Sequence, residues 1–284
     1  MSWWHNVEDV ITPTMNAEQM AGFVDGDGSL YMSGGQMNVS ITQCSYETLH
    51  KIQQVYGGVM RKRNPRAEHE SRQNHRHQYT LKFRGSQVAG ILPFIAPYLV
   101  IKAEKAEIML KILDLFEQRD DKAKAQRAIL VQKFNFIKQT TPKPRVERIT
   151  WDYISGLFQA EGCLRKDRLS ITQRHCPAVL HAIKAFMEEE FKVPIGNVDH
   201  ERFVTWRTTE IHTIVARLME CGLFHNEKLF QIHEFQKNDL LELTRLKHVD
   251  DDTPLETICI GNTRGLQLGR DLRCLWRNGR QKSF

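Results

Sequence analysis

Hydrophobic and polar positions follow two periods along the first half of the chain. From Ala17 to Val24 apolar residues recur at helical spacing, and the glycine-rich "DGDG" after them predicts the end of that helix. The segments "SLYMS" and "MNVSITQ" alternate with a period of two, which predicts a hairpin that turns at Gly34-Gly35. Further on, we expect a helix in "SYETLHKIQQVYG", strands in "VMRKR" and "HQYTLKF", and helices in "GSQVAGILPFIAPYL" and "KAEKAEIMLKILDLFEQ".

The second half of the chain repeats this order of elements. We predict a helix over residues 151–160, strands near 164–166 and 168–172, a helix over 177–191, two short strands around the "DHER" turn, and helices over 210–221 and 227–246. A chain of 284 residues is long enough for two such units. The pattern therefore predicts an α+β protein of two αββαββα repeats.

A linker and a tail lie outside the repeats. We place the first repeat in residues 1–118, the linker in 119–149, the second repeat in 150–247 and a basic C-terminal extension in 248–284. The linker is rich in lysine and arginine, so it is either a solvated connector or a segment that lies along phosphates. The extension, with its arginines around Trp276, is either a nucleic-acid-binding segment or the closing part of the second domain.

One short motif occurs twice. Residues 20–28, "MAGFVDGDG", can be laid over residues 154–162, "ISGLFQAEG", and "SITQ" follows each copy. Asp27 then aligns with Glu161, whereas Asp25 aligns with Gln159 and is not a matched acid. A calcium-binding EF-hand loop that starts at Asp25 is excluded, because its sixth position is Leu30 and its twelfth is Gln36 instead of glycine and glutamate.

Both copies also carry two small residues four positions apart, which puts them on one side of a helix. Such residues let two helix backbones approach more closely than the usual spacing of about 8–10 Å. If the two helices pack about a pseudo-twofold axis, Asp27 and Glu161 meet at their C-terminal ends, which is costly unless a cation lies between them. Carboxylates without clustered histidine or cysteine favour magnesium. The alternative is that both acids only cap turns. The small residues are Gly22 with Gly26, and Gly156 with Ala160.

Composition agrees with a polyanionic partner. The formal net charge is +6 and the pI is near 9.0. The six cysteines include no C-x-x-C pair, so we expect neither a zinc knuckle nor a disulfide scaffold, and reduced thiols in an intracellular compartment. The N-terminal "MSWWHNVEDV" lacks the features of a secretory or transit peptide, and no apolar run indicates a membrane span.

The two motifs resemble those of the LAGLIDADG homing endonucleases, in the form where one chain carries both halves. The resemblance covers roughly Ala17 to Leu246, and it is stronger in the first half, where "AGFVDGDGS", "ITQ" and "LVIKAEKAEIMLKIL" occur in family order. It implies a monomer with a saddle of two antiparallel sheets whose motif helices pack at the central interface. It also implies double-strand cleavage of a long DNA target in an organellar or microbial gene, which favours a chloroplast or mitochondrion as the compartment.

The resemblance implies roles for individual residues. Asp27 and Glu161 would bind Mg²⁺ or Mn²⁺, with two or three ions at the central interface. Gln43 and Gln173 match the position that places the attacking water, and Lys102 matches the basic residue near the scissile phosphate. The second half departs from the family pattern: "GLFHNEK" has His225 where a lysine is expected and Lys228 nearby. One strand would then be cut faster than the other, or cleavage would be reduced to nicking.

Specificity requires other side chains. A two-stranded ribbon fits the major groove of double-stranded DNA, and alternate residues on its face reach base edges. By position in the motif, the residues expected to contact DNA are Tyr31, Ser33, Asn38, Ser40, Arg61, Arg63, Gln78 and Thr80 in the first sheet, and Arg165, Asp167, Arg168, Ser170 and Arg202 in the second.

Three functions fit these observations. The first is a site-specific, magnesium-dependent DNA endonuclease, and the retention of both acids and both glutamines favours it. The second is an intron maturase or another RNA- or DNA-binding protein that has lost cleavage, and His225 is its main support. The third is a transcription regulator of the same ancestry.

Overall fold

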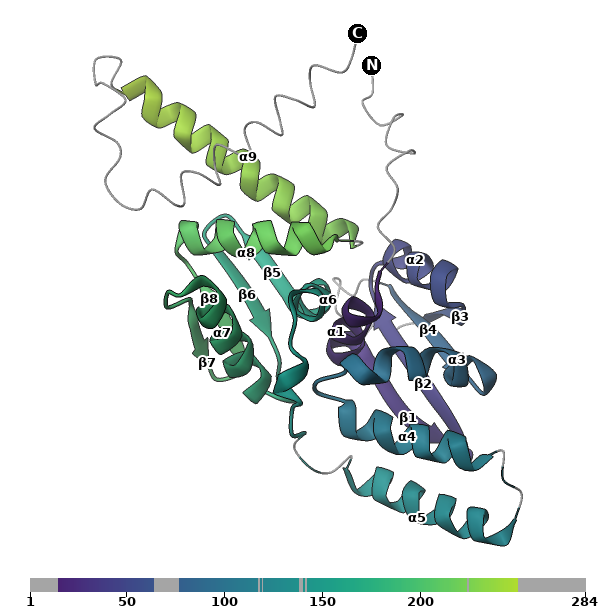
Figure 1. Cartoon of the computed structure of the whole chain (residues 1–284). Coiled ribbons are helices and arrows are strands. Elements are labelled where there is room, and N and C mark those ends of the chain that lie inside the picture. The colour runs from purple at the N-terminus through teal and green to yellow at the C-terminus, as the bar shows by residue number, and fades with distance from the viewer. Residues whose placement is uncertain are drawn as a thin grey trace, which may run out of the picture.

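Two four-stranded antiparallel sheets form the framework of the protein (Figure 1). The structure, a computed structural model, describes residues 15–63, 77–116, 118, 120–137, 140, 142–223 and 225–249, with backbone alone for residues 63 and 239–249. The predicted C-terminal extension therefore lies almost entirely outside the described residues. The first sheet has the order β1(Gly28–Ser33), β2(Gln36–Gln43), β4(Gln78–Arg84), β3(Val59–Arg63), and the second the order β5(Gly162–Arg165), β6(Arg168–Thr172), β8(Arg202–Thr205), β7(Asn197–Asp199).

Helices cover one face of each sheet, the face towards the viewer in Figure 1. In the first half these are α2(Tyr46–Tyr56), α3(Ser86–Ile95), the short 3-10 helix η3(Ala96–Tyr98) and α4(Ala103–Phe116). In the second they are α7(Ala178–Phe191) and α8(Thr208–Cys221), while α9(Asn226–Val249) starts beside the edge strand β5 and extends away from the sheet. The motif helices α1(Ala17–Asp27) and α6(Trp151–Glu161) lie side by side between the two sheets. The predicted fold, two αββαββα repeats, is confirmed.

Strand alternation sorts side chains between core and surface. In the first sheet Val39 is paired with Phe83 and Ile41 with Leu81, and all four side chains are buried beneath the helices. The hairpin between β1 and β2 turns at Gly34 and Gly35, whose φ values of +57° and +73° favour glycine. The opposite face of the sheet is left for the polar residues.

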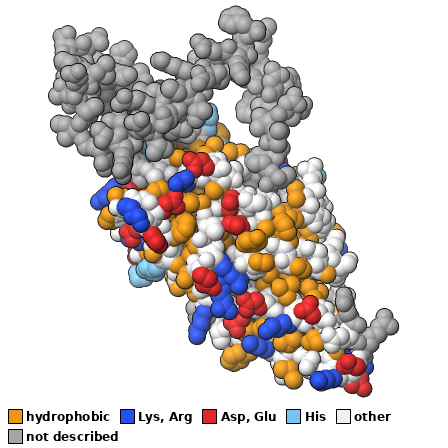
Figure 2. Space-filling model, viewed as in Figure 1, with side chains coloured by type: hydrophobic (Ala, Val, Ile, Leu, Met, Phe, Trp, Pro, Cys, Tyr) orange, Lys and Arg blue, Asp and Glu red, His pale blue; other side chains and the backbone are white. Residues whose placement is uncertain are grey.

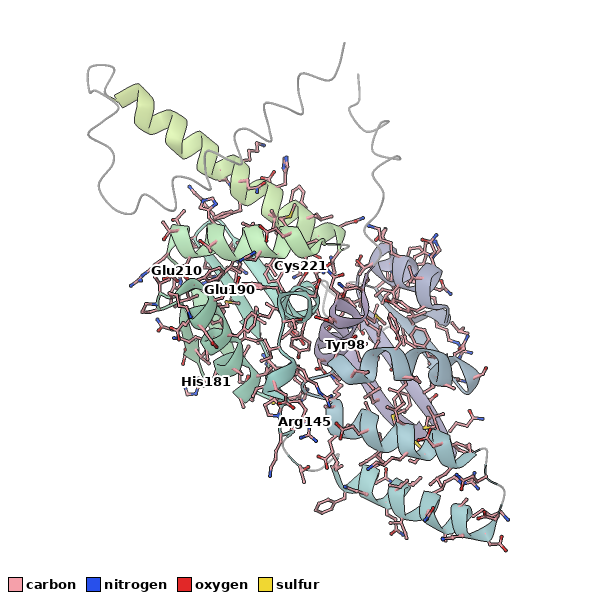
Figure 3. The ribbon with its side chains drawn as sticks, viewed as in Figure 1. Tyr98, Arg145, His181, Glu190, Glu210 and Cys221 are labelled. Carbon is pink, nitrogen blue, oxygen red and sulfur yellow. The ribbon has the colours of Figure 1, made fainter. Side chains whose placement is uncertain are left out.

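The linker is partly helical and packs against the first half. It contains α5(Asp121–Ile137), which lies along α4, and the turn η4(Val146–Arg148). Phe134 and Ile137 of α5 join the core of the first half. Arg148 donates to the carbonyls of Ala96 and Leu99, both at 3.1 Å, and Arg145, labelled in Figure 3, pairs with Glu107. These two arginines hold the linker to the first repeat.

The first motif helix ends where the sequence predicts. α1 stops at Asp27, inside "DGDG", and Gly28 is its C-cap. Gly26 is still helical and lies against Ala160 and Glu161 of α6, a close contact that a residue without a side chain allows.

The helical face carries both signs of charge. In Figure 2, acidic and basic side chains are interspersed over the visible described residues, so the positive charge of the chain does not gather there. Within the described part of the chain, no helix combines the length and the apolar character needed to cross a bilayer.

Candidate active site

Glycine contacts set the geometry of the two motif helices. A Cβ built on Gly22 would overlap the carbonyl oxygen of Tyr153, and one on Gly156 would overlap that of Gln19. Gly26 faces the Cβ of Ala160 in the same way. The contacting residues follow the same order along both helices. α1 and α6 therefore run in the same direction, and their backbones touch. Their C-terminal ends meet, as the sequence predicts.

Two acids stand at these meeting ends. Asp27 is the last residue of α1, and Glu161 is the last residue of α6. Burial, and then the negative charge of Glu161, raise the pKa of Asp27 to about 7. Burial also raises the pKa of Glu161. Each acid is thus costly to ionise in the free protein, and a nearby cation would remove that cost.

Two lysines, one from each half, offset the negative charge of Asp27 and Glu161. The Lys102 ammonium donates to the Val24 carbonyl at 2.9 Å and to the carbonyl of Asp25, so it caps the end of α1. The Lys228 ammonium donates to the carbonyl of Gly162, directly after α6. Burial lowers the pKa of both lysines, while the charges of the two acids raise it. The site therefore holds two carboxylates between two buried ammonium groups.

Asp25, which sequence comparison did not select, fixes the position of Lys102. Its carboxylate is 1% exposed and accepts the backbone N–H groups of Val100 and Ile101 at 2.8 Å and of Lys102 at 2.9 Å. The hydroxyl of Tyr153, from the other motif helix, donates to it at 3.0 Å. Asp25 is therefore a positioning residue for the loop that carries Lys102.

Gln159 has the matching role in the second half. Its Oε1 accepts the backbone N–H of His225 at 3.0 Å, and its Nε2 donates to Ser155 at 3.3 Å. Asp25 and Gln159 differ in charge, but each accepts a backbone N–H from the residue that precedes a helix, Lys102 before α4 and His225 before α9.

This correspondence shows which residues of the two halves occupy equivalent positions near the acids. "KAEK" before and within α4 lines up with "HNEK" before and within α9, so His225 matches Lys102 and Lys228 matches Lys105. Lys105 was not predicted from the sequence, although this alignment would have found it. His225 is 3% exposed, its Nδ1 has no hydrogen-bond partner, and burial lowers its pKa to about 4. It is neutral at pH 7, so the ammonium of the second half comes from Lys228.

The two predicted glutamines behave differently. The Gln43 side chain donates to Asp27 Oδ2, which lowers the pKa of that acid. Gln173 is 3% exposed, and its Oε1 instead accepts the backbone N–H of His175 at 3.1 Å. Gln173 and Glu161 are both described, and no hydrogen bond joins them. The structure therefore brings together Asp27, Glu161, Gln43, Lys102 and Lys228, whereas the Gln173 side chain is bound to the backbone of its own segment.

Most residues predicted to contact DNA in the first sheet lie on its helix-free face. Strand register puts Tyr31, Ser33, Ser40, Arg61, Gln78 and Thr80 there, opposite in parity to the core residues. Asn38 shares this parity but is 2% exposed and donates to the Gln36 carbonyl. Arg63 is paired with Gln78, and its side chain is not described. Two residues that we did not predict also lie on this face, because alternate residues of a strand point to the same side. They are Lys82, whose ammonium lies 4.9 Å from the Tyr31 ring centre, and Arg84.

The second sheet has fewer free polar positions. Arg165 and Arg168 are paired across the β5–β6 turn that contains Asp167, and Arg202 is paired with Thr172. Arg165, Asp167 and Arg202 are exposed, whereas Ser170 is only 8% exposed. Arginines therefore dominate the predicted DNA-contacting set in this half.

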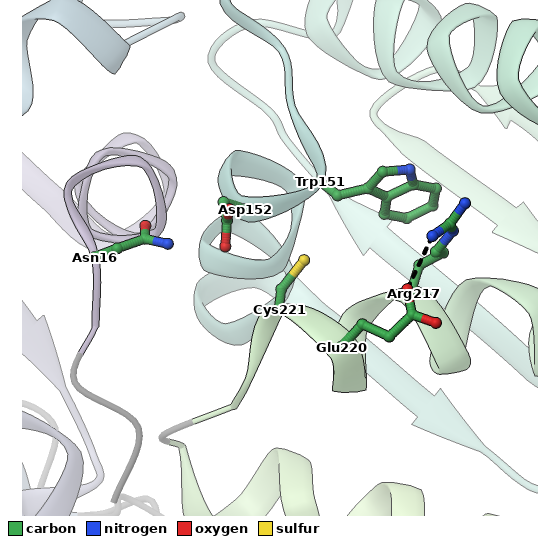
Figure 4. Close-up of a pocket in the computed structure, with 6 residues that line it drawn as sticks. All are labelled: Asn16, Trp151, Asp152, Arg217, Glu220 and Cys221. Atoms are coloured by element: carbon green, nitrogen blue, oxygen red, sulfur yellow. Dashed lines mark hydrogen bonds and ion pairs between the residues drawn. The ribbon is translucent and has the colours of Figure 1, made fainter. Parts of the chain in front are cut away.

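A hollow at the other end of the motif helices is separate from the acids (Figure 4). It lies beside Asn16, which caps α1, and beside the first residues of α6. Helices of this length are roughly 15 Å long, so the hollow is far from Asp27 and Glu161. Arg217 pairs there with Glu220 at 2.9 Å and with Glu190 at 2.6 Å. The hollow is lined by Asn16, Trp151, Asp152, Arg217, Glu220 and Cys221.

Comparison with solved structures confirms the fold of the LAGLIDADG homing endonucleases in their single-chain, two-repeat form. The chain is similar to I-SmaMI bound to uncleaved DNA with calcium ions, with a TM-score of 0.58 and 15% identity over 90% of this chain and 97% of that one. It is also similar to the homing endonuclease I-GzeII in complex with its DNA target, with a TM-score of 0.57 and 15% identity over 89% and 95% of the chains. The meganuclease I-CpaMI, bound to uncleaved DNA, matches with a TM-score of 0.56 and 13% identity over 81% and 92%. No protein-family model and no curated protein sequence matches the chain.

Proposed function

We propose that this protein is a LAGLIDADG homing endonuclease, which cuts both strands of a long DNA target by divalent-metal hydrolysis. The observation that carries the proposal is the pair of acids at the touching ends of α1 and α6. Neither acid has a close ion-pair partner among the described residues, and the pKa of Asp27 is raised to about 7. A binding protein gains nothing from such a pair beside phosphates. Solved proteins of the same fold are bound to DNA.

The donor set fits a hard divalent cation. Two carboxylates supply hard oxygen ligands, and other ligands must come from outside the protein, because the described residues contain no group of three or more His, Cys, Asp and Glu side chains suited to a metal. Asp27 and Glu161 would hold Mg²⁺ or Mn²⁺, and phosphate oxygens and water would complete the coordination. A cation held there supplies Lewis-acid activation of the phosphodiester and stabilises the leaving oxygen.

The residues around the acids have distinct tasks in this proposal. Gln43, which donates to Asp27, orients that carboxylate and the attacking water beside it. Lys102 and Lys228 stabilise the charge that develops on the phosphate, because buried ammonium groups act strongly where water is excluded. Asp25 and Gln159 keep the loops before α4 and α9 in place. Because both acids lie at one interface, the two strands are cut close together.

The helix-free faces of the sheets would contact the major groove. Arg61, Lys82 and Arg84 on the first sheet and Arg165, Arg168 and Arg202 on the second give this surface an excess of positive charge. Alternate side chains along each strand reach base edges, and the arginines and lysines at the strand ends contact phosphates. A monomeric state, a role in intron or intein mobility, and action in an organelle stay predictions of the resemblance.

A protein that binds without cutting is the second candidate. His225 is neutral at pH 7, and Gln173 makes no hydrogen bond to Glu161 of the kind that joins Gln43 to Asp27, so the second half lacks two features of the first. In the extreme case the protein nicks one strand, or binds RNA as an intron maturase.

The experiment is a selection from a pool of long random duplexes, incubated with the full-length protein and Mg²⁺. The proposal expects double-strand breaks at one enriched sequence, loss of cutting with EDTA, and recovery with Mg²⁺ or Mn²⁺. Tight RNA binding without any cut in the DNA pool would favour the maturase.

A further inference from the structure

The connection between sheet and helix after the second motif is longer than after the first. In the first half only Cys44 separates Gln43 from Ser45, the N-cap of α2. In the second half residues 174–176 separate Gln173 from Pro177, the N-cap of α7. The two additional positions bring two basic side chains, Arg174 and His175, next to the motif.

This longer connection is held in place at several points. Gln173 Oε1 accepts the backbone N–H of His175 at 3.1 Å, and the Gln173 N–H donates to the Glu201 carbonyl at 2.7 Å. Cys176 is fully buried, and its thiol lies 3.6 Å from the Pro142 carbonyl oxygen. The backbone of the segment is thus fixed, while the side chain of Arg174 remains 78% exposed.

The longer connection lies at the same end of the second sheet as the second acid. Gly162 of β5 pairs with Ile171 of β6, so Glu161, directly before β5, lies at the sheet end where the segment after Gln173 begins. In the first half the single residue at this place, Cys44, carries no positive charge. The second half therefore has exposed basic groups near its acid and a neutral His225 at the position of Lys102.

We infer that Arg174, with His175 beside it, contacts the phosphate of the DNA strand that is cut on the Glu161 side, and compensates there for the neutral His225. The inference rests on the proposed function and extends it by a residue outside the motif. An arginine presents several N–H donors to phosphate oxygens and keeps its charge at any working pH. In the free protein Arg174 Nε lies 3.4 Å from Glu201 Oε2, an exposed ion pair of little strength that DNA can replace.

The test compares three variants that change charge differently. Arg174→Gln removes the proposed phosphate contact, and Glu201→Gln removes only the partner of Arg174. Lys122→Gln removes one positive charge from an exposed position on α5, which packs against α4 on the helix-covered side of the first half, away from the helix-free face of the sheet. For each, we would measure the salt dependence of binding to the duplex that the wild-type protein enriches in a binding selection with Ca²⁺, and the cutting rate of each strand with Mg²⁺.

The inference expects Arg174→Gln to reduce the slope of log K against log[salt] by about 0.9, the value for one lost phosphate contact. It also expects one strand to be cut on the order of 10²-fold more slowly while the other is cut normally. Glu201→Gln should retain or strengthen binding, and Lys122→Gln should leave both readouts unchanged. Equal losses in Arg174→Gln and Glu201→Gln would overturn the inference, because they indicate an ion pair that only supports the fold.

The two readouts separate this inference from the proposed function. If the wild-type protein binds DNA without cutting it and Arg174→Gln lowers the salt slope, the phosphate contact stands and the endonuclease does not. If the wild-type protein cuts both strands and Arg174→Gln behaves like Lys122→Gln, the endonuclease stands and the inference fails. A wild-type protein that binds no duplex would overturn both.

Discussion

The phenol of Tyr153 donates a hydrogen bond to the carboxylate of Asp25 at 3.0 Å, across the interface between the two motif helices. Asp25 belongs to the first repeat and Tyr153 to the second, and both are buried. The same carboxylate holds the loop before α4, whose Val100 and Ile101 side chains pack into the core of the second half. One buried acid therefore joins the two repeats and the loop that carries Lys102.

Removing the Asp25 carboxylate should destabilise the protein more than removing the Tyr153 hydroxyl. Tyr153→Phe deletes one hydrogen bond and should lower the free energy of unfolding by about 1 kcal/mol. Asp25→Ala leaves three buried backbone N–H groups without an acceptor and should cost about 3 kcal/mol or more. Denaturant unfolding of both variants and of the double variant would measure their coupling. Tyr46→Phe, at a 43% exposed side chain, is the control and should leave stability unchanged. Additive effects would show that Asp25 and Tyr153 act independently.

The contact between helix backbones predicts that a single methyl group at Gly22 is disruptive. Gly22→Ala would push a Cβ into the Tyr153 carbonyl oxygen and should destabilise the protein by about 3 kcal/mol, the upper end of the cost of overpacking. Gly90→Ala is the matched control, because a Cβ at Gly90 in α3 meets no atom within 4 Å. It should stabilise the protein by about 0.5–1 kcal/mol through helix propensity. Thermal or denaturant unfolding measures whether Gly22→Ala is destabilised and Gly90→Ala is stabilised. A Gly22→Ala variant as stable as the wild type would contradict the close packing.

The raised pKa of Asp27 predicts how the stability of the metal-free protein depends on pH. Folding raises this pKa from 3.8 to about 7, so the folded state binds the proton more tightly. The unfolding free energy from this group therefore falls as pH rises from about 4 to 7. His225 acts in the opposite direction, because folding lowers its pKa from 6.5 to about 4 and stability falls as pH drops through that range.

Asp27→Asn isolates the first of these contributions. The variant keeps the size of the side chain but cannot ionise, so it should gain stability relative to the wild type as pH rises from 4 to 8. The difference should reach a few kcal/mol. Urea unfolding of both proteins in EDTA at several pH values measures it. A difference that does not change with pH would mean that Asp27 is ionised normally and does not crowd Glu161.

The two ammonium groups should matter more for cutting than for folding. Lys102→Met and Lys228→Met remove the donor to backbone carbonyls at the ends of α1 and α6, which should lower the free energy of unfolding by about 1–3 kcal/mol and leave the protein folded. Each variant should nevertheless cut DNA on the order of 10²-fold more slowly, because the developing phosphate charge loses its stabilising cation. Unfolding curves and single-turnover cutting rates check the two expectations. Lys111→Met, at an exposed residue of α4, should change neither.

Much of the fold follows from local patterns, and the site does so less completely. The hairpins were predictable because each strand buries alternate residues, and Gly34-Gly35 supplies a turn with positive φ. The end of α1 was also predictable, because the helix stops at Asp27, inside the glycine-rich "DGDG". The role of Asp25 was missed because its partners are distant in sequence, and Gln159 matches its hydrogen-bonding role without matching its charge.

The most direct test of the shared acid pair is strand-resolved cutting by Asp27→Asn and Glu161→Gln. With both acids at one interface, we expect each variant to bind the selected duplex in Ca²⁺ with unchanged affinity. We also expect neither strand to be cut in Mg²⁺. If each variant lost the cutting of one strand only and cut the other at the wild-type rate, the acids would serve separate centres, and the shared site would be contradicted.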